Sequence, residues 1–215
     1  MGEHAWKWTG RKIVAGAEVV ATVWDGNFLI EDPPELGGAV VVSPGWILAD
    51  QDDPVSSRDP GVSFRTFTSV GRTAFDAALA RSGGGKIVFW PSSASVLSDV
   101  PSVRGVSKSW GAGDPFGLLL DPVRLLTPEM VADADEHLRR AAEDLLGLDR
   151  LWALRLTDAV LEGGRIRETP VGKGALPMEA LRTFASGAVS RGLPIVLLGD
   201  HFETQLRVLG LGDAR

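Results

Sequence analysis

The sequence predicts an α+β fold, with an α/β fold as the alternative, in which flanking helices cover a mixed sheet built from two similar halves. Two observations lead to this prediction. Short apolar runs of strand length alternate with longer segments of helical periodicity. In addition, two stretches of the chain carry related patterns in the same order. With 44% hydrophobic and 23% charged residues, the chain has the composition of a soluble globular protein.

The first third of the chain consists mainly of strand-like runs. Lys12 to Trp24 is rich in β-branched and apolar residues, and Asp25-Gly26 separates it from Phe28 to Ile30. An Asp-Gly pair between two such runs favours a two-residue hairpin turn, so we expect a hairpin there. Further short strands are expected at 39–42, 46–49, 62–68 and 87–90.

Thr127 to Gly147 is the strongest predicted helix. Thr127 suits the N-cap, Pro128 suits the first turn, and Gly147 suits the left-handed exit. Leu138, Ala141 and Leu145 belong to its apolar face. We also expect helices from Thr73, around 181–189 and over 202–209, strands over 118–120, 151–156 and 195–198, and a loop over 91–109.

An internal repeat connects the two halves. Phe28 to Leu36 resembles Gly117 to Leu125, and residues 74–90 share with 181–198 a helix, a glycine stop and a strand. We therefore predict a duplication whose copies pack as a pseudo-twofold pair in one globular unit; the alternative is chance similarity between ordinary αβ units. The predicted parts are an N-terminal segment 1–10, a first αβ repeat 11–98, and a second repeat 99–215 with the inserted helix 127–147.

Composition excludes several function classes. The net charge is −6 with no basic run, which speaks against nucleic-acid binding. Cysteine is absent, and this excludes disulfides, thiolate nucleophiles and cysteine metal ligands. No apolar run reaches the length of a membrane span, and the first ten residues lack the apolar region of a secretory signal. We expect a cytoplasmic bacterial protein.

Asp200, His201 and Glu203 are the sharpest catalytic candidates. They follow an apolar strand, and ligands of open α/β sheets bind beyond the carboxyl ends of strands. A histidine beside carboxylates can ligate a metal or act as a general base. The structural alternative is that Asp200 caps the last helix and His201 lies in its first turn.

Asp50, Asp52 and Asp53 form an acidic cluster in a turn-rich segment. Carboxylate oxygens suit calcium or magnesium. However, the later glycine and glutamate of an EF-hand loop are missing here. A solvated loop or a partner-binding edge is the better interpretation of this cluster.

Two residue pairs are predicted binding sites. Ser92 and Ser93 follow a strand, and their hydroxyl and amide groups can hold an anion. Trp6 and Trp8 stand in a polar N-terminal segment, and tryptophans in such a place often contact the protein body or a partner.

No complete catalytic motif is present, and we therefore expect a non-catalytic binding protein, of the immunity-protein or regulatory kind, whose partner is another protein. A homodimer is compatible with the sequence, and no cofactor follows from it. The first alternative is a small metal-dependent hydrolase or transferase that uses Asp200 and His201. The second is a small-ligand sensor with its pocket between the halves.

Overall fold

Eight strands close into a single barrel in a computed structural model that describes residues 5–27, 39–43, 71–81, 85–110 and 116–212. The strands follow one another around the barrel in chain order, and the last pairs with the first. They are β1 (Ala5–Trp8), β2 (Lys12–Ala15), β3 (Glu18–Asn27), β4 (Ala39–Ser43), β5 (Ile87–Phe89), β6 (Phe116–Leu120), β7 (Leu151–Leu156) and β10 (Ile195–Leu198).

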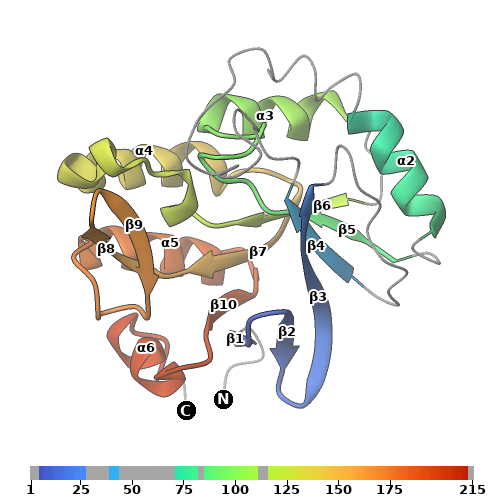
Figure 1. Cartoon of the computed structure of the whole chain (residues 1–215). Coiled ribbons are helices and arrows are strands. Elements are labelled where there is room, and N and C mark those ends of the chain that lie inside the picture. The colour runs from blue at the N-terminus through green and yellow to red at the C-terminus, as the bar shows by residue number, and fades with distance from the viewer. Residues whose placement is uncertain (1–4, 28–38, 44–70, 82–84, 111–115, 213–215) are drawn as a thin grey trace.

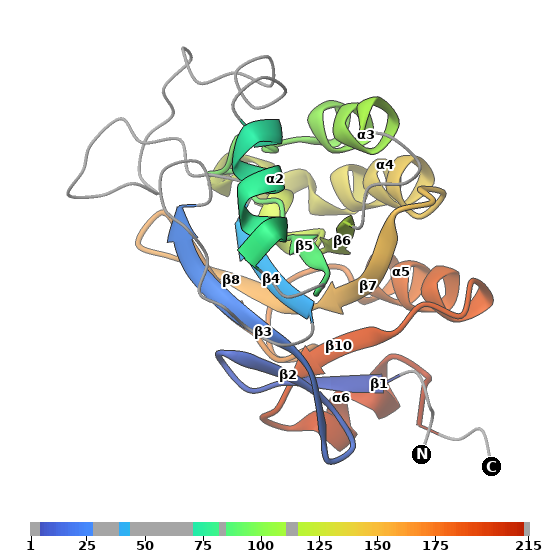
Figure 2. The same cartoon turned by 90° about the vertical axis from the view of Figure 1, so that its right-hand side faces the viewer.

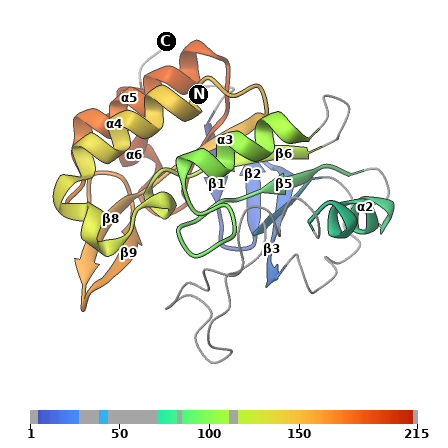
Figure 3. The same ribbon diagram turned by 90° about the horizontal axis from the view of Figure 1, so that it is seen from above.

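Strand direction explains where the helices lie. β2 runs antiparallel to β1 and β3, whereas all other neighbouring strands are parallel. Parallel neighbours need long crossover connections, which usually contain a helix. The helices therefore surround the β4–β10 side of the barrel, as Figures 1 to 3 show from three directions. They are α2 (Arg72–Arg81), α3 (Val100–Ser109), α4 (Ala134–Leu145), α5 (Met178–Ser190) and α6 (Phe202–Val208), with short 3-10 turns η2 (Val123–Leu125) and η3 (Pro128–Asp133).

The barrel wall separates two hydrophobic cores. Along β6, Leu119 points into the barrel, while Leu118 and Leu120 pack outward against the helices. Both faces of such a strand are buried, which explains why it is apolar throughout rather than alternating. The inner core consists of Ile13, Ala21, Val41, Val88, Leu119, Ala153 and Val196.

The predicted α+β fold with two packed halves is wrong. β1, from the predicted N-terminal segment, and β10, from the predicted second repeat, pair in parallel and close the same barrel, with Trp6 opposite Val196. This pairing joins the two ends of the chain, and no local pattern encodes it. The duplication itself stays a prediction.

Two local predictions are also wrong. Asp25 and Gly26 lie within β3, and the hairpin turn falls instead between β2 and β3, where Gly16 has a φ of 61°. The segment expected to be a loop contains α3, which Asp99 caps: its carboxylate accepts from the amide of Ser102 at 2.9 Å, and the Ser102 hydroxyl accepts from the Asp99 amide at 3.2 Å. Asp99 is a favoured N-cap residue and Pro101 suits the first turn, so the start of this helix was readable in the sequence.

Most other elements confirm the predictions. β4, β5, β6, β7 and β10 lie within about a residue or two of their predicted ranges, and so do the starts of α2 and α6. The long predicted helix begins as η3 and continues as α4. The strands predicted at 28–30, 46–49 and 62–68 lie outside the described residues. No helix in the described part of the chain is long and apolar enough to cross a membrane.

Candidate functional site

The carboxyl ends of β5, β6 and β7 bring polar side chains together. Trp90 and Ser92 follow β5, Asp121 follows β6, and Arg155 is the penultimate residue of β7. The strand registers, continued past the ends of the pairs, place Ser92, Asp121 and Arg155 in one row. Each is an even number of residues from an inner-core position, so this row points into the barrel.

Arg155 links two carboxylates at this end of the barrel. Its Nη1 lies 2.5 Å from Oδ2 of Asp121, and its Nη2 lies 2.7 Å from Oε2 of Glu168. The Trp90 indole also donates to Oδ2 of Asp121, at 3.3 Å. The side chains of Arg155 and Asp121 are 2% and 0% exposed, whereas that of Glu168 is 33% exposed. We call Asp121, Arg155 and Glu168 the mouth cluster.

Glu168 reaches the mouth cluster from a hairpin that follows β7. The hairpin consists of β8 (Asp158–Glu162) and β9 (Arg165–Thr169), which pair with each other outside the barrel sheet. At its base, the buried Asp158 carboxylate accepts four backbone N–H groups at 2.8–3.2 Å, three of them from residues 172–176. This carboxylate fixes the loop that leaves the hairpin, and with it the strand that carries Glu168.

Two tryptophans enclose the Arg155 guanidinium. It lies 4.5 Å from the ring centroid of Trp8 and 5.1 Å from that of Trp90, and the two rings are 4.7 Å apart. Arg124 lies 3.7 Å from the Trp90 ring, and its carbonyl accepts from the amide of Ser93 at 2.7 Å. Cation–π contacts are strongest when the cation is desolvated, so these rings stabilise the charge where it is buried.

Burial decides the ionisation of the cluster. It raises the pKa of Asp121 above its ordinary value of 3.8, although the charge of Arg155 opposes the rise. Burial also lowers the pKa of Arg124. For Arg155 burial lowers the pKa as well, but the charges of Asp121 and Glu168 raise it by more, and the net direction is upward. The site thus holds a permanent cation beside a carboxyl group that retains a proton more readily than usual.

Unpartnered polar atoms mark the space around the cluster. In the described part of the chain, the buried side-chain atoms without a hydrogen-bond partner are Oγ of Ser92, Oδ1 of Asp121, Nε of Arg155 and Oγ1 of Thr157 and Thr169. All lie at the carboxyl ends of β5, β6 and β7 or at the base of the hairpin. Native proteins rarely leave buried polar atoms unsatisfied. Water or the polar groups of a ligand are therefore needed here.

The catalytic candidates from the sequence lie elsewhere at this end of the barrel. Asp200 and His201 form the turn between β10 and α6, Glu203 lies in the first turn of α6, and all three are exposed. His201 adopts a left-handed conformation with φ of 56°, and it occupies the N-cap of α6 without a side-chain hydrogen bond, so Asp200 is not the cap. A catalytic role for these residues stays a prediction.

The predicted binding residues fall in different places. Trp6 and Trp8 belong to β1, where their rings pack on Trp152 at 5.0 Å and on Trp90 at 4.7 Å. They are thus part of the barrel wall rather than of a separate segment. Ser92 lies in one row with Asp121 and Arg155, and Ser93 is the next residue along the chain. The acidic cluster of Asp50, Asp52 and Asp53 lies outside the described residues.

None of the three mouth-cluster residues was among the predicted site residues. Arg155 interrupts an otherwise apolar strand, and Asp121 directly follows one. A charged residue inside a buried strand needs a partner, which is a readable signal of a special site. Glu168 gave no such signal, because its role depends on the hairpin folding back over the barrel.

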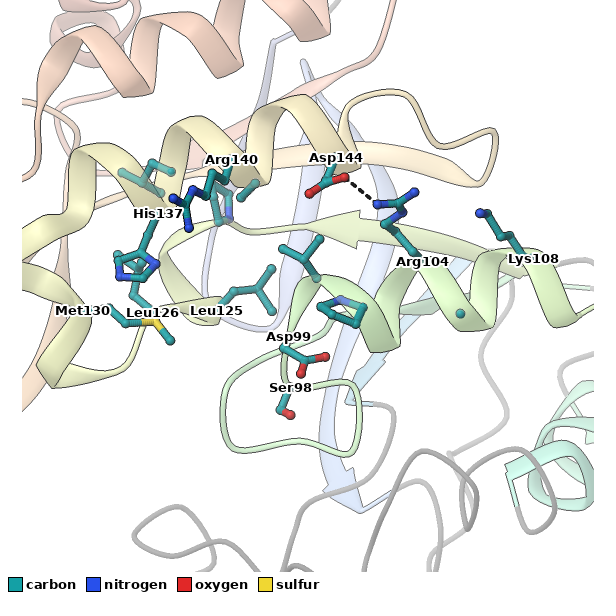
Figure 4. Close-up of a pocket in the computed structure, with 16 residues that line it drawn as sticks. Ser98, Asp99, Arg104, Lys108, Leu125, Leu126, Met130, His137, Arg140 and Asp144 are labelled. Atoms are coloured by element: carbon teal, nitrogen blue, oxygen red, sulfur yellow. Dashed lines mark hydrogen bonds and ion pairs between the residues drawn. The ribbon is translucent and has the colours of Figure 1, made fainter.

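A cleft between α3 and α4 is a second feature of the surface (Figure 4). It has a volume of about 670 Å³ and lies outside the barrel. Arg104 and Asp144 form an ion pair across it at 2.5 Å, and both side chains are more than 40% exposed. Lys108, His137 and Arg140 also line it. The paired charges of this cleft are more than 40% exposed, whereas Asp121 and Arg155 are almost fully buried, so the mouth cluster is the better candidate for chemistry.

No protein-family model matches the chain, and no curated protein is significantly similar to it. Eight chains of solved structures match it, and two of them illustrate the likeness. One is a D-tagatose 3-epimerase-like protein, 12% identical, with a TM-score of 0.51; the other is the IolI protein with a bound zinc atom, 12% identical, with a TM-score of 0.45. Both matches cover 81% of this chain and 60% of the other, so this chain spans less than two thirds of the length of those proteins.

The closed eight-stranded barrel and the first of these likenesses show a TIM-barrel fold, which departs from the all-parallel pattern only in β2, antiparallel to both of its neighbours. They correct the expectation of a non-catalytic, immunity-type binding protein with an α+β sheet. That expectation rested on the lack of a complete motif along the sequence. The barrel instead assembles its polar groups from separate strand ends, where no contiguous motif is required.

Proposed function

We propose that this chain is an enzyme of the isomerase or epimerase type, with the mouth cluster as its active site. TIM-barrel enzymes carry their active sites at the carboxyl ends of the strands, which is where the cluster lies. The fold likeness to an epimerase-like protein supports the same class of reaction. The substrate we propose is a small hydroxylated carbonyl compound of the sugar type.

The observation that carries this proposal is the pairing of two unlike carboxyl groups. Asp121 is buried, its pKa is raised by burial, and its Oδ1 has no protein partner. Glu168 is part-exposed on the hairpin. Two titratable groups in contrasting environments are the arrangement that acid–base catalysis uses. The unpartnered hydroxyls of Ser92 and Thr157 suit a ligand that carries hydroxyl groups.

The chemistry follows from these two groups. Glu168, as a carboxylate, takes a proton from the carbon beside the substrate carbonyl, and the electrons of the broken C–H bond form an enediolate. Asp121, as a carboxylic acid, gives a proton back to carbon. Glu168 then loses its proton to solvent and Asp121 gains one, which restores the starting state and exchanges the substrate hydrogen with water.

Deuterium exchange tests the proposal. Purified protein is incubated in D₂O with a panel of ketoses, aldoses and their hydroxy-acid analogues, and NMR follows deuterium at the carbon beside the carbonyl. We expect Asp121→Asn and Glu168→Gln each to slow exchange by about a hundredfold or more. Glu162→Gln is the matched control, because Glu162 is an exposed carboxylate of the same hairpin, 2.6 Å from Arg167. Wild-type rates in both site variants, or no exchange on any compound, would contradict the proposal.

A cytoplasmic location and a homodimeric state are separate proposals from the sequence. Fractionation of the host cells tests the first, and light scattering of the purified protein tests the second.

A further inference from the structure

Asp121 and Glu168 are the kind of oxygen donors that a divalent cation uses. A metal-dependent enzyme was one alternative from the sequence, and one of the similar solved structures contains zinc. The mouth cluster can therefore be tested for its fit to a metal. The side chain of Arg155 occupies the position between these two carboxylates.

We propose that the guanidinium of Arg155 is the resident cation of this site and takes the place of a divalent metal ion between Asp121 and Glu168. The inference deepens the proposed function, because it names the group that stabilises negative charge on the substrate. Its test does not depend on turnover.

Geometry is the first support. The two terminal nitrogens of Arg155 lie 2.5 Å from an Asp121 oxygen and 2.7 Å from a Glu168 oxygen, so one planar group spans both carboxylates. A guanidinium directs its N–H groups in a rigid fork that matches carboxylate oxygens. A metal ion could bind both oxygens only after Arg155 had left.

Arg155 cannot easily leave. Its guanidinium lies 4.5 Å from the Trp8 ring and 5.1 Å from the Trp90 ring, and the side chain is 2% exposed. Its charge is permanent, because arginine does not lose its proton in proteins. Loss of the cation by movement or by titration is therefore disfavoured.

Charge balance is the second support. Two guanidinium groups, Arg155 and Arg124, act on the Asp121 carboxylate, and Glu168 supplies the second negative charge. With Asp121 ionised, the positive and negative charges are equal in number without a metal. With Asp121 protonated, as in the proposed reaction, the positive charges exceed the negative ones. An added divalent ion would be repelled by a fixed cation in a buried, weakly screened place.

The donor set is the third support. Zinc sites generally need three or more protein ligands. Among the residues that the structure describes, no three His, Cys, Asp or Glu side chains stand together in a way that could hold a metal ion. The cluster offers two carboxylates, both engaged by Arg155.

The third guanidinium nitrogen of Arg155, Nε, indicates the role of this residue. Its Nε is buried and has no protein partner, so its N–H is available to donate to a substrate oxygen. When a proton leaves the neighbouring carbon, negative charge develops on that oxygen. A preorganised N–H donor in a water-excluded site stabilises such charge strongly.

Calorimetric titration tests the inference. Protein dialysed against EDTA is titrated with zinc, manganese and magnesium chlorides. We expect Asp121→Asn and Glu168→Gln to bind each cation as the wild type does, because Arg155 already occupies the site. Arg155→Met, which keeps an unbranched stem but removes the guanidinium and its charge, should gain one cation equivalent. The double variant Arg155→Met, Asp121→Asn should lose it again.

The decisive contrary result is a wild type that binds one cation equivalent and loses it in both Asp121→Asn and Glu168→Gln. If the wild type and these two variants bind a cation equally well, the cation binds at another site, and this result agrees with the inference. This comparison needs no Arg155 variant, so it holds even where Arg155→Met fails to fold. A protein that binds no metal here and exchanges no deuterium would overturn the proposed function and leave the inference standing.

Discussion

Asp158→Asn tests how the hairpin that carries Glu168 is held in place. Asp158 is 1% exposed, and its carboxylate accepts four backbone N–H groups. Oδ1 accepts from Ala159 at 2.8 Å and Leu176 at 3.0 Å, and Oδ2 accepts from Gly172 at 3.2 Å and Gly174 at 2.9 Å. Asparagine has only one side-chain oxygen. In either orientation of its amide, the NH₂ group faces two of the four backbone N–H groups and cannot accept a hydrogen bond from them.

The expected loss of stability follows from these bonds. A hydrogen bond to a charged group contributes about 1.5–3 kcal/mol, and two are lost. The amides of Gly172 and Gly174 are only partly buried and can bind water, so we take the lower end, about 3 kcal/mol. For a protein of this size, that corresponds to a fall in Tm of about 6–12 °C. Asp158→Ala, which removes all four acceptors, should unfold more easily still.

Urea and thermal unfolding of the variants provide the measurement. Asp76→Asn is the control, because it also turns an aspartate into an asparagine but breaks only an exposed ion pair with Arg72. Such a pair contributes about 0.5 kcal/mol or less. If Asp158→Asn unfolds within about 0.5 kcal/mol of this control, the four-amide account of the loop is incorrect.

Two further predictions concern the same region. Gly174→Ala should destabilise the protein by about 1–3 kcal/mol. The added Cβ would overlap Oδ1 of Asp158 and lie 2.5 Å from the carbonyl oxygen of Ala159. Gly147→Ala is the control in the same urea assay, because a Cβ at Gly147 meets nothing within 4 Å. Burial raises the pKa of Asp121, so folding disfavours the charged form of this carboxyl group. The protonated group therefore contributes to stability at a pH below 3.8, its ordinary pKa, and this contribution is lost as the pH rises through the pKa of the folded state. Wild-type protein should therefore lose stability relative to Asp121→Asn as the pH rises from about 4, and parallel pH–stability curves for the two proteins would refute this.

The sequence predicted most individual elements because their signals are local. The apolar run of β10 predicts a buried strand, and the periodicity of residues 134–145 predicts a helix. The N-cap residue Asp99 and the first-turn proline Pro101 were equally local and could have revealed α3. The predicted turn at Asp25-Gly26 is wrong for another reason. Turn propensity is weak, and the parallel pairing of β3 with β4 shifts register at these two residues and resumes at Asn27, so they form an irregularity within the strand.

The candidate site was predictable only in part. Arg155 in an apolar strand and Asp121 at a strand end are visible in the sequence as charges that need partners. Which partners they find depends on the parallel register of β6 and β7 and on the hairpin that returns Glu168 to the barrel. By contrast, Asp200 and His201 attract attention as neighbours in sequence, yet they form an exposed turn.

By itself, the sequence determined the local elements, the apolar strands buried on both faces and the absence of cysteine chemistry, because propensity and periodicity act over a few residues. Tertiary structure alone decided that β1 and β10 close a barrel, and that residues 121, 155 and 168 meet at its mouth. The physical reason is that strand pairing and ion pairing select partners by position in space, across any separation along the chain.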